Sequence, residues 1–126
     1  MKLNHDCIRD LLLYLEENLD YNKEINLNNI NLGNYSQNDL LYTAEKLSEA
    51  NFLNTVIKWN TTSTHIIVVK SITYNGHEFL DTIRDETVWK ETKSILSKVS
   101  SSSISFISNI AIQVLSNIIS KQMGLS

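Results

Sequence analysis

The chain contains no proline, three glycines and one cysteine among its 126 residues. A single thiol, Cys7, cannot form a disulfide within the chain, and this fits a reducing compartment such as the cytosol. Three glycines are too few for a glycine-rich loop that cradles phosphate. The chain does not open with basic residues followed by an apolar leader, so we expect a cytoplasmic protein rather than a secreted one.

Positive charge is also scarce. The chain has 11 Lys and Arg residues against 14 Asp and Glu residues, which gives a net charge of −3. Proteins dedicated to nucleic-acid binding usually carry a basic excess, so we expect any DNA binding to be weak and mainly electrostatic. With 42% hydrophobic residues, a chain of 126 residues can bury the core of one domain, with room for a terminal appendage.

Two amphipathic segments predict helices in the first half of the chain. The first covers residues 5–19, with Asn4 as its N-cap, because its apolar residues recur at helical spacing. The second covers residues 36–50, where Ser36 and the acid three positions later resemble a capping box. We expect this helix to end at Asn51, a residue that tolerates the left-handed conformation.

Extended structure is predicted in three places. Alternating apolar residues over 25–32 predict a short strand, followed by a turn at Gly33-Asn34. Residues 55–59 and 65–73 are rich in β-branched side chains, and the polar loop 60–64 lies between them. This pattern predicts a β-hairpin with a long tip.

Helix, short strand, helix and hairpin is the order of elements in a winged-helix domain, with residues 60–64 as the wing and 25–35 in place of the usual middle helix. The stretch 46–53 also resembles the end of a recognition helix in bacterial winged-helix regulators. We therefore predict an α+β chain. A winged-helix-like domain covers residues 1–98, additional C-terminal helices follow the hairpin, and residues 99–126 form an apolar C-terminal helix.

The segment after the hairpin contains His77-Glu78-Phe79-Leu80-Asp81, which resembles half of a zinc-protease helix. Such a helix needs two imidazoles four positions apart and a third ligand, whereas Asp81 occupies the second position here. We expect no metal, no cofactor and no catalytic residue. We interpret His77, Asp81 and Arg84 as a polar cluster that faces a partner.

Local signals place two helices around this cluster. Thr73 or Asn75 is the expected N-cap of the first. Asp85 and Glu86 lie at the expected start of the second. The apolar side of the second helix is predicted to consist of Trp89, Ile95, Leu96 and Val99.

The stretch from Ile72 to Asp85, continuing to Val88-Trp89 and Lys93, resembles the signature of the family named domain of unknown function 2513. The opening residues 6–12 are similar to the start of that family, and Tyr35-Ser36 with the helix that follows fits its middle. The resemblance covers residues 1–98, and Gly76-His77-x-Phe79-Leu80-Asp81 is its most specific part. It implies a winged-helix-like fold, a phage or prophage setting, and no known reaction.

The would-be recognition helix bears on DNA binding, because its exposed side would enter the major groove. That helix carries three acids against one base, which disfavours contact with phosphates. The candidate contacts to nucleic acid or to a partner are Gln37, Asn38, Lys46, Lys58, Trp59 and Lys70. We expect a non-enzymatic phage or prophage protein that acts by binding, as a regulator or a protein-interaction adaptor. The alternative is a phage-encoded inhibitor of a host enzyme or defence complex.

The tail has no charged residue from Val99 to Ser120. Its apolar side predicts a helix over about 101–123 that mediates self-association, with a dimer as the default. The tail is too polar, at about half Ser, Asn and similar residues, for one lipid-facing span. Packing against its own domain and lying on a membrane surface are the alternatives. The predicted seam consists of Ile104, Ile107, Ala111, Val114 and Ile118.

Overall fold

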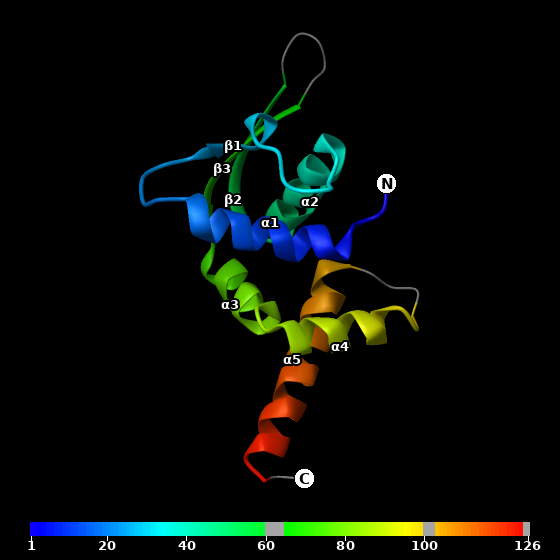
Figure 1. The fold of residues 1–126 in the computed structure, drawn as a ribbon. Coiled ribbons are helices and arrows are strands. Elements are labelled where there is room, and N and C mark those ends of the chain that lie inside the picture. The colour runs from blue at the N-terminus through cyan, green and yellow to red at the C-terminus, as the bar shows by residue number, and fades with distance from the viewer. Residues whose placement is uncertain (60–64, 100–102, 125–126) are drawn as a thin grey trace. The chain divides into compact units, whose positions relative to one another are not determined.

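A computed structural model of the chain describes residues 1–59, 65–99 and 103–124 (Figure 1). The predicted α+β class is confirmed, since the described residues form five α-helices and a three-stranded antiparallel sheet. The predicted loop 60–64 lies outside the described residues. The elements in chain order are α1 (His5–Asn18), β1 (Ile25–Asn26), the 3₁₀ helix η1 (Leu27–Asn29), α2 (Gln37–Glu49), β2 (Leu53–Trp59), β3 (His65–Ile72), α3 (Tyr74–Ile83), α4 (Glu86–Leu96) and α5 (Ile104–Gln122).

The chain divides into two compact units, which we call unit 1 (residues 1–77) and unit 2 (residues 78–126). Unit 1 contains the elements from α1 to β3, and unit 2 contains α4 and α5. Helix α3 runs across the boundary between them. The domain boundary that the sequence predicts after residue 98 stays a prediction.

The helices of unit 1 begin and end where local side chains satisfy their free backbone groups. The Asn4 carboxamide oxygen accepts the N–H of Cys7 at 3.1 Å, and the Ser36 hydroxyl accepts the N–H of Asp39 at 3.1 Å. Both predicted N-caps are confirmed. Asn51 has φ of 65° and follows the last turn of α2, so the predicted left-handed end is also confirmed.

The sheet has the order β1-β3-β2. In the hairpin, Ile57 lies opposite Ile67 and Trp59 lies opposite His65. Helix α1 packs against α2, and α2 packs against β2. Strand β3 also contacts α1 and α2, and its residues Ile67 and Val69 are fully buried. The large, fully buried side chains of the unit are Ile8, Leu11, Leu12, Leu15, Leu27, Leu40, Leu47, Ile67 and Val69.

The segment 25–32 differs from its predicted form. Only Ile25 and Asn26 form a strand, and the chain then turns into η1. The cause is local, because the Asn26 side chain accepts the N–H of Asn28 at 2.9 Å and so offers the backbone an alternative to the sheet. Leu27 is fully buried by this turn. The predicted turn at Gly33 is confirmed by its φ of 53°.

Thr73, one of the two predicted N-caps, starts α3. Its hydroxyl accepts the N–H of Gly76 at 3.0 Å and donates to the carbonyl of Asn51 at 2.6 Å. Asn75 lies inside the helix, so the alternative cap is wrong. A Cβ atom at position 76 would collide with the Phe52 carbonyl oxygen and would lie 2.8 Å from Cγ2 of Ile72. Glycine at this position therefore allows the start of α3 to approach the backbone that follows α2.

Unit 2 contains two helices that pack against each other. Asp85 lies at the start of α4, as predicted, and caps the helix by accepting the N–H of Val88 at 3.0 Å. Val99 is an exception to the predicted apolar side, because α4 ends at Leu96 and Val99 is 45% exposed. Thr92 is fully buried instead, and its hydroxyl donates to the carbonyl of Val88 at 2.7 Å.

Helix α5 is confirmed as a helix with the bounds Ile104–Gln122. The Ser103 hydroxyl caps it by accepting the N–H of Phe106 at 3.2 Å. The buried residues of α5 are Ile104, Ile107, Ala111 and Val114.

Candidate functional site

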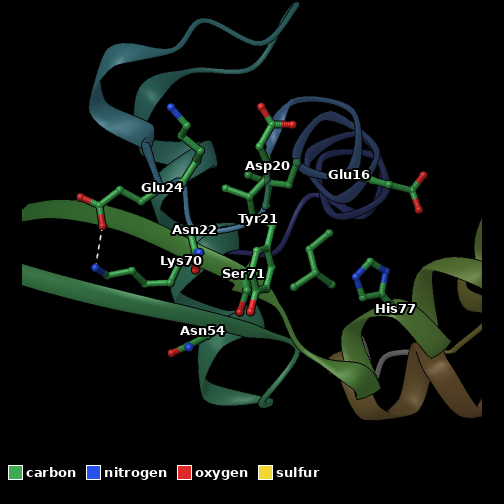
Figure 2. Close-up of a pocket in the computed structure, with 13 residues that line it drawn as sticks. Glu16, Asp20, Tyr21, Asn22, Glu24, Asn54, Lys70, Ser71 and His77 are labelled. Carbon is green, nitrogen blue, oxygen red and sulfur yellow. Dashed lines mark ion pairs between the residues drawn. The ribbon is translucent and has the colours of Figure 1, made fainter.

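Unit 1 contains a surface groove with a volume of about 660 Å³ (Figure 2). Its walls come from the last turns of α1, the loop 20–24, the adjoining ends of β2 and β3, and the first turn of α3. The lining residues are Leu15, Glu16, Leu19, Asp20, Tyr21, Asn22, Lys23, Glu24, Asn54, Lys70, Ser71, Ile72 and His77. The sequence patterns predict only Lys70 and His77 among them as site residues.

The loop 20–24 owes its shape to one residue in the left-handed conformation. Asn22 has φ of 63°, and the N–H of Lys23 donates to the carbonyl of Asp20 at 3.0 Å. Asparagine tolerates this conformation better than most residues. The turn leaves Tyr21 93% exposed above a floor that includes the buried residues Leu15 and Ile72. The groove therefore combines an apolar floor with an exposed aromatic side chain at its rim.

The charges around the groove nearly balance. Glu16, Asp20 and Glu24 line it together with two lysines and His77. Lys70 and Glu24 form an ion pair at 2.6 Å, drawn as a dashed line in Figure 2. The hydrogen bond from Lys70 and its positive charge lower the pKa of the Glu24 carboxyl. Because this lysine is already paired, the groove presents no concentrated positive charge to a phosphate.

Two of the six residues predicted to contact nucleic acid or a partner are bonded to other groups of unit 1, although their side chains reach the surface. Gln37 donates from its Nε2 to the carbonyl of Leu27 at 2.9 Å. Lys46 forms an ion pair with Glu49 at 2.9 Å and lies 5.4 Å from the centre of the Tyr42 ring. Together with the paired Lys70, these contacts leave little of the predicted positive surface available.

The other three predicted contact residues are exposed. Asn38 lies on the first turn of α2, and Lys58 lies near the end of β2. Trp59 is 66% exposed, and its ring centre lies 3.5 Å from that of His65 across the hairpin. The exposed residues are therefore one amide, one ammonium group and one indole, which is a mixed surface rather than a basic one.

The predicted polar cluster His77, Asp81 and Arg84 divides into two parts. His77 is exposed and lines the groove of unit 1. Asp81 and Arg84 form an ion pair at 2.8 Å one turn further along α3. Within residues 1–59, 65–99 and 103–124, no group of three or more His, Cys, Asp or Glu side chains is arranged to hold a metal ion.

Cys7 is fully buried on α1, and its Sγ lies 3.9 Å from the carbonyl oxygen of Asp39. Burial raises the pKa of this thiol, and the negative charges of Asp39 and Asp10 act in the same direction. A thiol in this environment stays protonated at neutral pH, whereas a nucleophilic cysteine needs a lowered pKa. Cys7 is therefore part of the core of unit 1.

Two sets of side-chain hydrogen bonds in unit 1, which we call polar ties, could not be predicted from the sequence. The Tyr35 hydroxyl donates to the Asp10 carboxylate at 2.6 Å. Burial raises the pKa of Tyr35, and the bond to Asp10 raises it further. The Asn28 side chain donates to the carbonyl of His65 at 2.8 Å and accepts the N–H of Ile67 at 3.1 Å. Both ties join residues at least 25 positions apart, which no local pattern can predict.

The predicted self-association seam on α5 is largely occupied within the chain. Its first four residues are buried, and Ile118 is partly exposed. The large apolar side chains of α5 that stay exposed are Ile112 at 49% and Ile119 at 46%. Self-association through the tail stays a prediction, and it would use these exposed residues rather than the buried seam. By length and composition alone, α5 is the one helix in the described ranges that could also cross a membrane.

Comparisons with known proteins relate most of the chain to one family. The family model described as "Hypothetical protein (DUF2513)" matches residues 2–103. A protein of Haemophilus influenzae named "Uncharacterized protein" is 28% identical over 120 residues, which cover 94% of this chain and 99% of that protein. No solved structure is significantly similar to the chain.

Proposed function

The chain belongs to the family described as "Hypothetical protein (DUF2513)", and from this premise we propose that it is a non-enzymatic, winged-helix-like protein that acts by binding another protein. It serves as a regulator or an adaptor. The family resemblance implies a phage or prophage setting, so the partner is sought among phage and host proteins.

The topology of unit 1 supports the winged-helix part of this proposal. The order of α1, β1, α2 and the hairpin is that of a winged-helix domain, and β1 adds to the outer edge of β3 to give the order β1-β3-β2. The short η1 stands where the middle helix of such domains is expected. In a winged-helix domain, the hairpin formed by β2 and β3 would be the wing.

The charges of α2 favour a protein partner over DNA. A recognition helix uses free Arg, Lys, Asn or Gln side chains to read bases and to contact phosphates. Here Lys46 is paired with Glu49, and Gln37 is bound to the backbone of η1. Approach of α2 to a phosphate backbone would bring acids towards negative charge without free cations to compensate.

The observation that carries the proposal is the groove with Tyr21 at its rim. Tyr21 is 93% exposed, and buried aliphatic side chains form the floor beside it. Tyrosine is enriched in protein interfaces because it offers a large apolar area and a hydroxyl with few rotatable bonds. An apolar floor surrounded by balanced charge is suited to a protein segment rather than to an anion.

A site-specific photocrosslinking experiment tests this proposal. A photoreactive amino acid at Tyr21, on the full chain, should give a discrete protein adduct in a lysate of the source cells. The matched control carries the same group at Asn38, which is exposed on α2. Nuclease treatment should leave the Tyr21 adduct intact.

Equal adducts at the two positions, or adducts that disappear with nuclease, would contradict a protein-binding groove. A sequence-specific DNA footprint at physiological salt would contradict the proposal as a whole. In that case, replacing Asn38 and Lys58 should abolish the footprint.

A further inference from the structure

The two edge strands of the sheet in unit 1 differ in how many of their backbone groups have hydrogen-bond partners. The outer edge of β3 is covered by β1, which pairs with Val68 and Val69. Beyond β1, the Asn28 side chain binds the carbonyl of His65 and the N–H of Ile67. One carboxamide thereby supplies a donor and an acceptor as a further strand residue would. The outer edge of β3 is therefore closed along most of its length.

The outer edge of β2 exposes a defined set of backbone groups. In an antiparallel ladder, successive residues of a strand direct their N–H and C=O groups to opposite sides. His65 and Ile67 of β3 direct theirs to Asn28, away from β2. Their partners in the register, Trp59 and Ile57, therefore direct their own groups away from β3. Thr55, two residues earlier, does the same.

This edge is only lightly protected. Proteins prevent edge-to-edge pairing with proline, charged side chains (lysine above all) or bulges. The chain has no proline, and the irregularity of the ladder lies at the start of β2, between Asn54 and Thr55. The only charged residue of β2 is Lys58. Ile57 is 38% exposed and Trp59 is 66% exposed, so apolar side chains accompany backbone groups that no other strand of the described sheet pairs with.

We propose that the β2 edge binds the β2 edge of a second copy of this chain, in an antiparallel pair centred on Ile57. The inference goes beyond the proposed function, because it concerns a surface outside the groove and a different partner. Ile57 would face the second copy's Ile57, and Thr55 would face the second copy's Trp59. Each such pair exchanges two backbone hydrogen bonds, so the three pairs at 55, 57 and 59 form roughly six.

The occupant is a second copy because the edge is complementary to itself. In the register centred on Ile57, Lys58 faces the second copy's Val56, so no like charges lie directly opposite. Thr55 and Trp59 pair a small residue with a large one on each side of the two-fold axis. The exposed indole would lie beside the second copy's Thr55, whose hydroxyl is 2.7 Å from that of Ser48 on α2. Two-fold symmetric dimers are also the commonest closed assemblies.

Charge substitution at the symmetry axis tests this pairing. The full chain should sediment as a concentration-dependent dimer. Ile57→Lys and Ile57→Glu each place like charges directly opposite one another, so each should weaken dimerisation by roughly tenfold or more. Mixing the two variants should restore the dimer, because Lys then faces Glu. If the two substitutions at Ile57 acted only by destabilising the fold of their own chain, mixing the variants would not restore the dimer.

Two control variants make the result specific. The Lys58→Glu variant should dimerise equally well alone and in a mixture with the original chain. The reason is that position 58 faces Val56 of the second copy rather than the second copy's position 58. Ile112→Ser with Ile119→Ser removes the exposed apolar residues of α5 and should leave the dimer unchanged. A monomer at high micromolar concentration, a dimer that survives both charge variants, or a dimer lost only in the α5 variant would overturn the proposal.

Where the charged variants fail to fold, cysteine crosslinking gives the answer. Ile57→Cys should form an interchain disulfide under mild oxidation, since directly opposed Cα atoms lie about 5.5 Å apart in such a pair. Lys58→Cys is the matched control, and its thiols are offset from each other. Cys7 is fully buried and does not compete. Equal crosslinking at positions 57 and 58 would contradict the register.

Discussion

Both units cap their helices with side chains three positions away, but unit 1 also has hydrogen bonds between residues far apart in the sequence. Asn28 binds β3 across more than 35 positions, and Tyr35 binds Asp10 across 25. In unit 2, Asp85 binds Val88 and Ser103 binds Phe106, each three positions away. Apolar burial between α4 and α5 supplies the tertiary packing of unit 2.

This difference predicts which kinds of substitution should destabilise each unit. A polar tie requires particular atoms at particular positions, because a buried group that loses its partner is left unsatisfied. An apolar contact requires volume, and related side chains replace one another at little cost. We therefore expect unit 1 to respond to the loss of single polar groups and unit 2 to respond to the loss of buried volume.

The largest effect is expected in unit 2. Ile107→Ala should lower the free energy of unfolding by about 2 to 5 kcal/mol, because a fully buried aliphatic side chain is removed and leaves a cavity. Urea denaturation measures the loss, and hydrogen exchange should locate it in residues 78–126. Ile112→Ala, at a position 49% exposed, should stay within about 0.5 kcal/mol of the original. Equal losses would mean that α5 is not held by its buried side.

The next effect concerns the start of α3. Gly76→Val should destabilise by about 3 kcal/mol, the upper part of the range for overpacking, because the Phe52 carbonyl that it meets cannot rotate away. Gly33→Ala is the matched control, since nothing lies within 4 Å of the added carbon and only its positive φ is strained. It should cost about 1 kcal/mol. Similar melting shifts for the two variants would argue against the close approach.

Removal of the Asn28 carboxamide, which closes the β3 edge, should lower the free energy of unfolding by a somewhat smaller amount. Asn28→Ala leaves the His65 carbonyl and the Ile67 N–H without their partner, at a cost of about 2 kcal/mol. Hydrogen exchange of the Ile67 amide should accelerate more than that of Val68, which pairs within the hairpin. Asn29→Ala, at the exposed neighbouring position, should change neither quantity. Unchanged exchange at Ile67 would show that this edge is not closed by Asn28.

The smallest effect is expected at Tyr35. Tyr35→Phe removes its bond to the Asp10 carboxylate and should cost about 1 to 2 kcal/mol. The pKa of Tyr35 is raised in the folded chain. Its contribution is therefore complete below the ordinary pKa of 10.0 and is lost only as the pH rises through the raised value.

The difference between Tyr35→Phe and the original chain should accordingly stay constant from neutral pH to about pH 9. Urea denaturation at several pH values measures it. Tyr21→Phe, at a position 93% exposed, is the control and should have no effect on stability. A difference that shrinks already at neutral pH would contradict the assignment of the bond.

Much of the local structure was predictable from neighbouring residues. The caps at Asn4, Ser36 and Asp85 and the helix end at Asn51 are each fixed by a side chain or a backbone preference within one turn of the helix. Where two local interpretations compete, the same reasoning is weaker. The alternation over 25–32 predicts a strand, but the Asn26 side chain turns the backbone into η1.

The groove was less predictable than the helices around it. Lys70 and His77 are conspicuous in the sequence, but the ion pair between Lys70 and Glu24 depends on β3 lying beside the loop 20–24. Likewise, the apolar pattern of α5 predicts a seam but does not specify what covers it. The structure buries its first four residues within the chain.

The sequence by itself determined the order of helices and strands, the polarity of their faces and the positions where most of them start and stop. These properties depend on backbone geometry and on side chains a few positions apart. Only the tertiary structure decided that Asn28 closes one edge of the sheet, that Tyr35 binds Asp10, and that Gly76 lies against Phe52. Such contacts depend on the path of the chain between distant residues. The free energy that selects that path is a sum over the whole core and is not contained in any one segment.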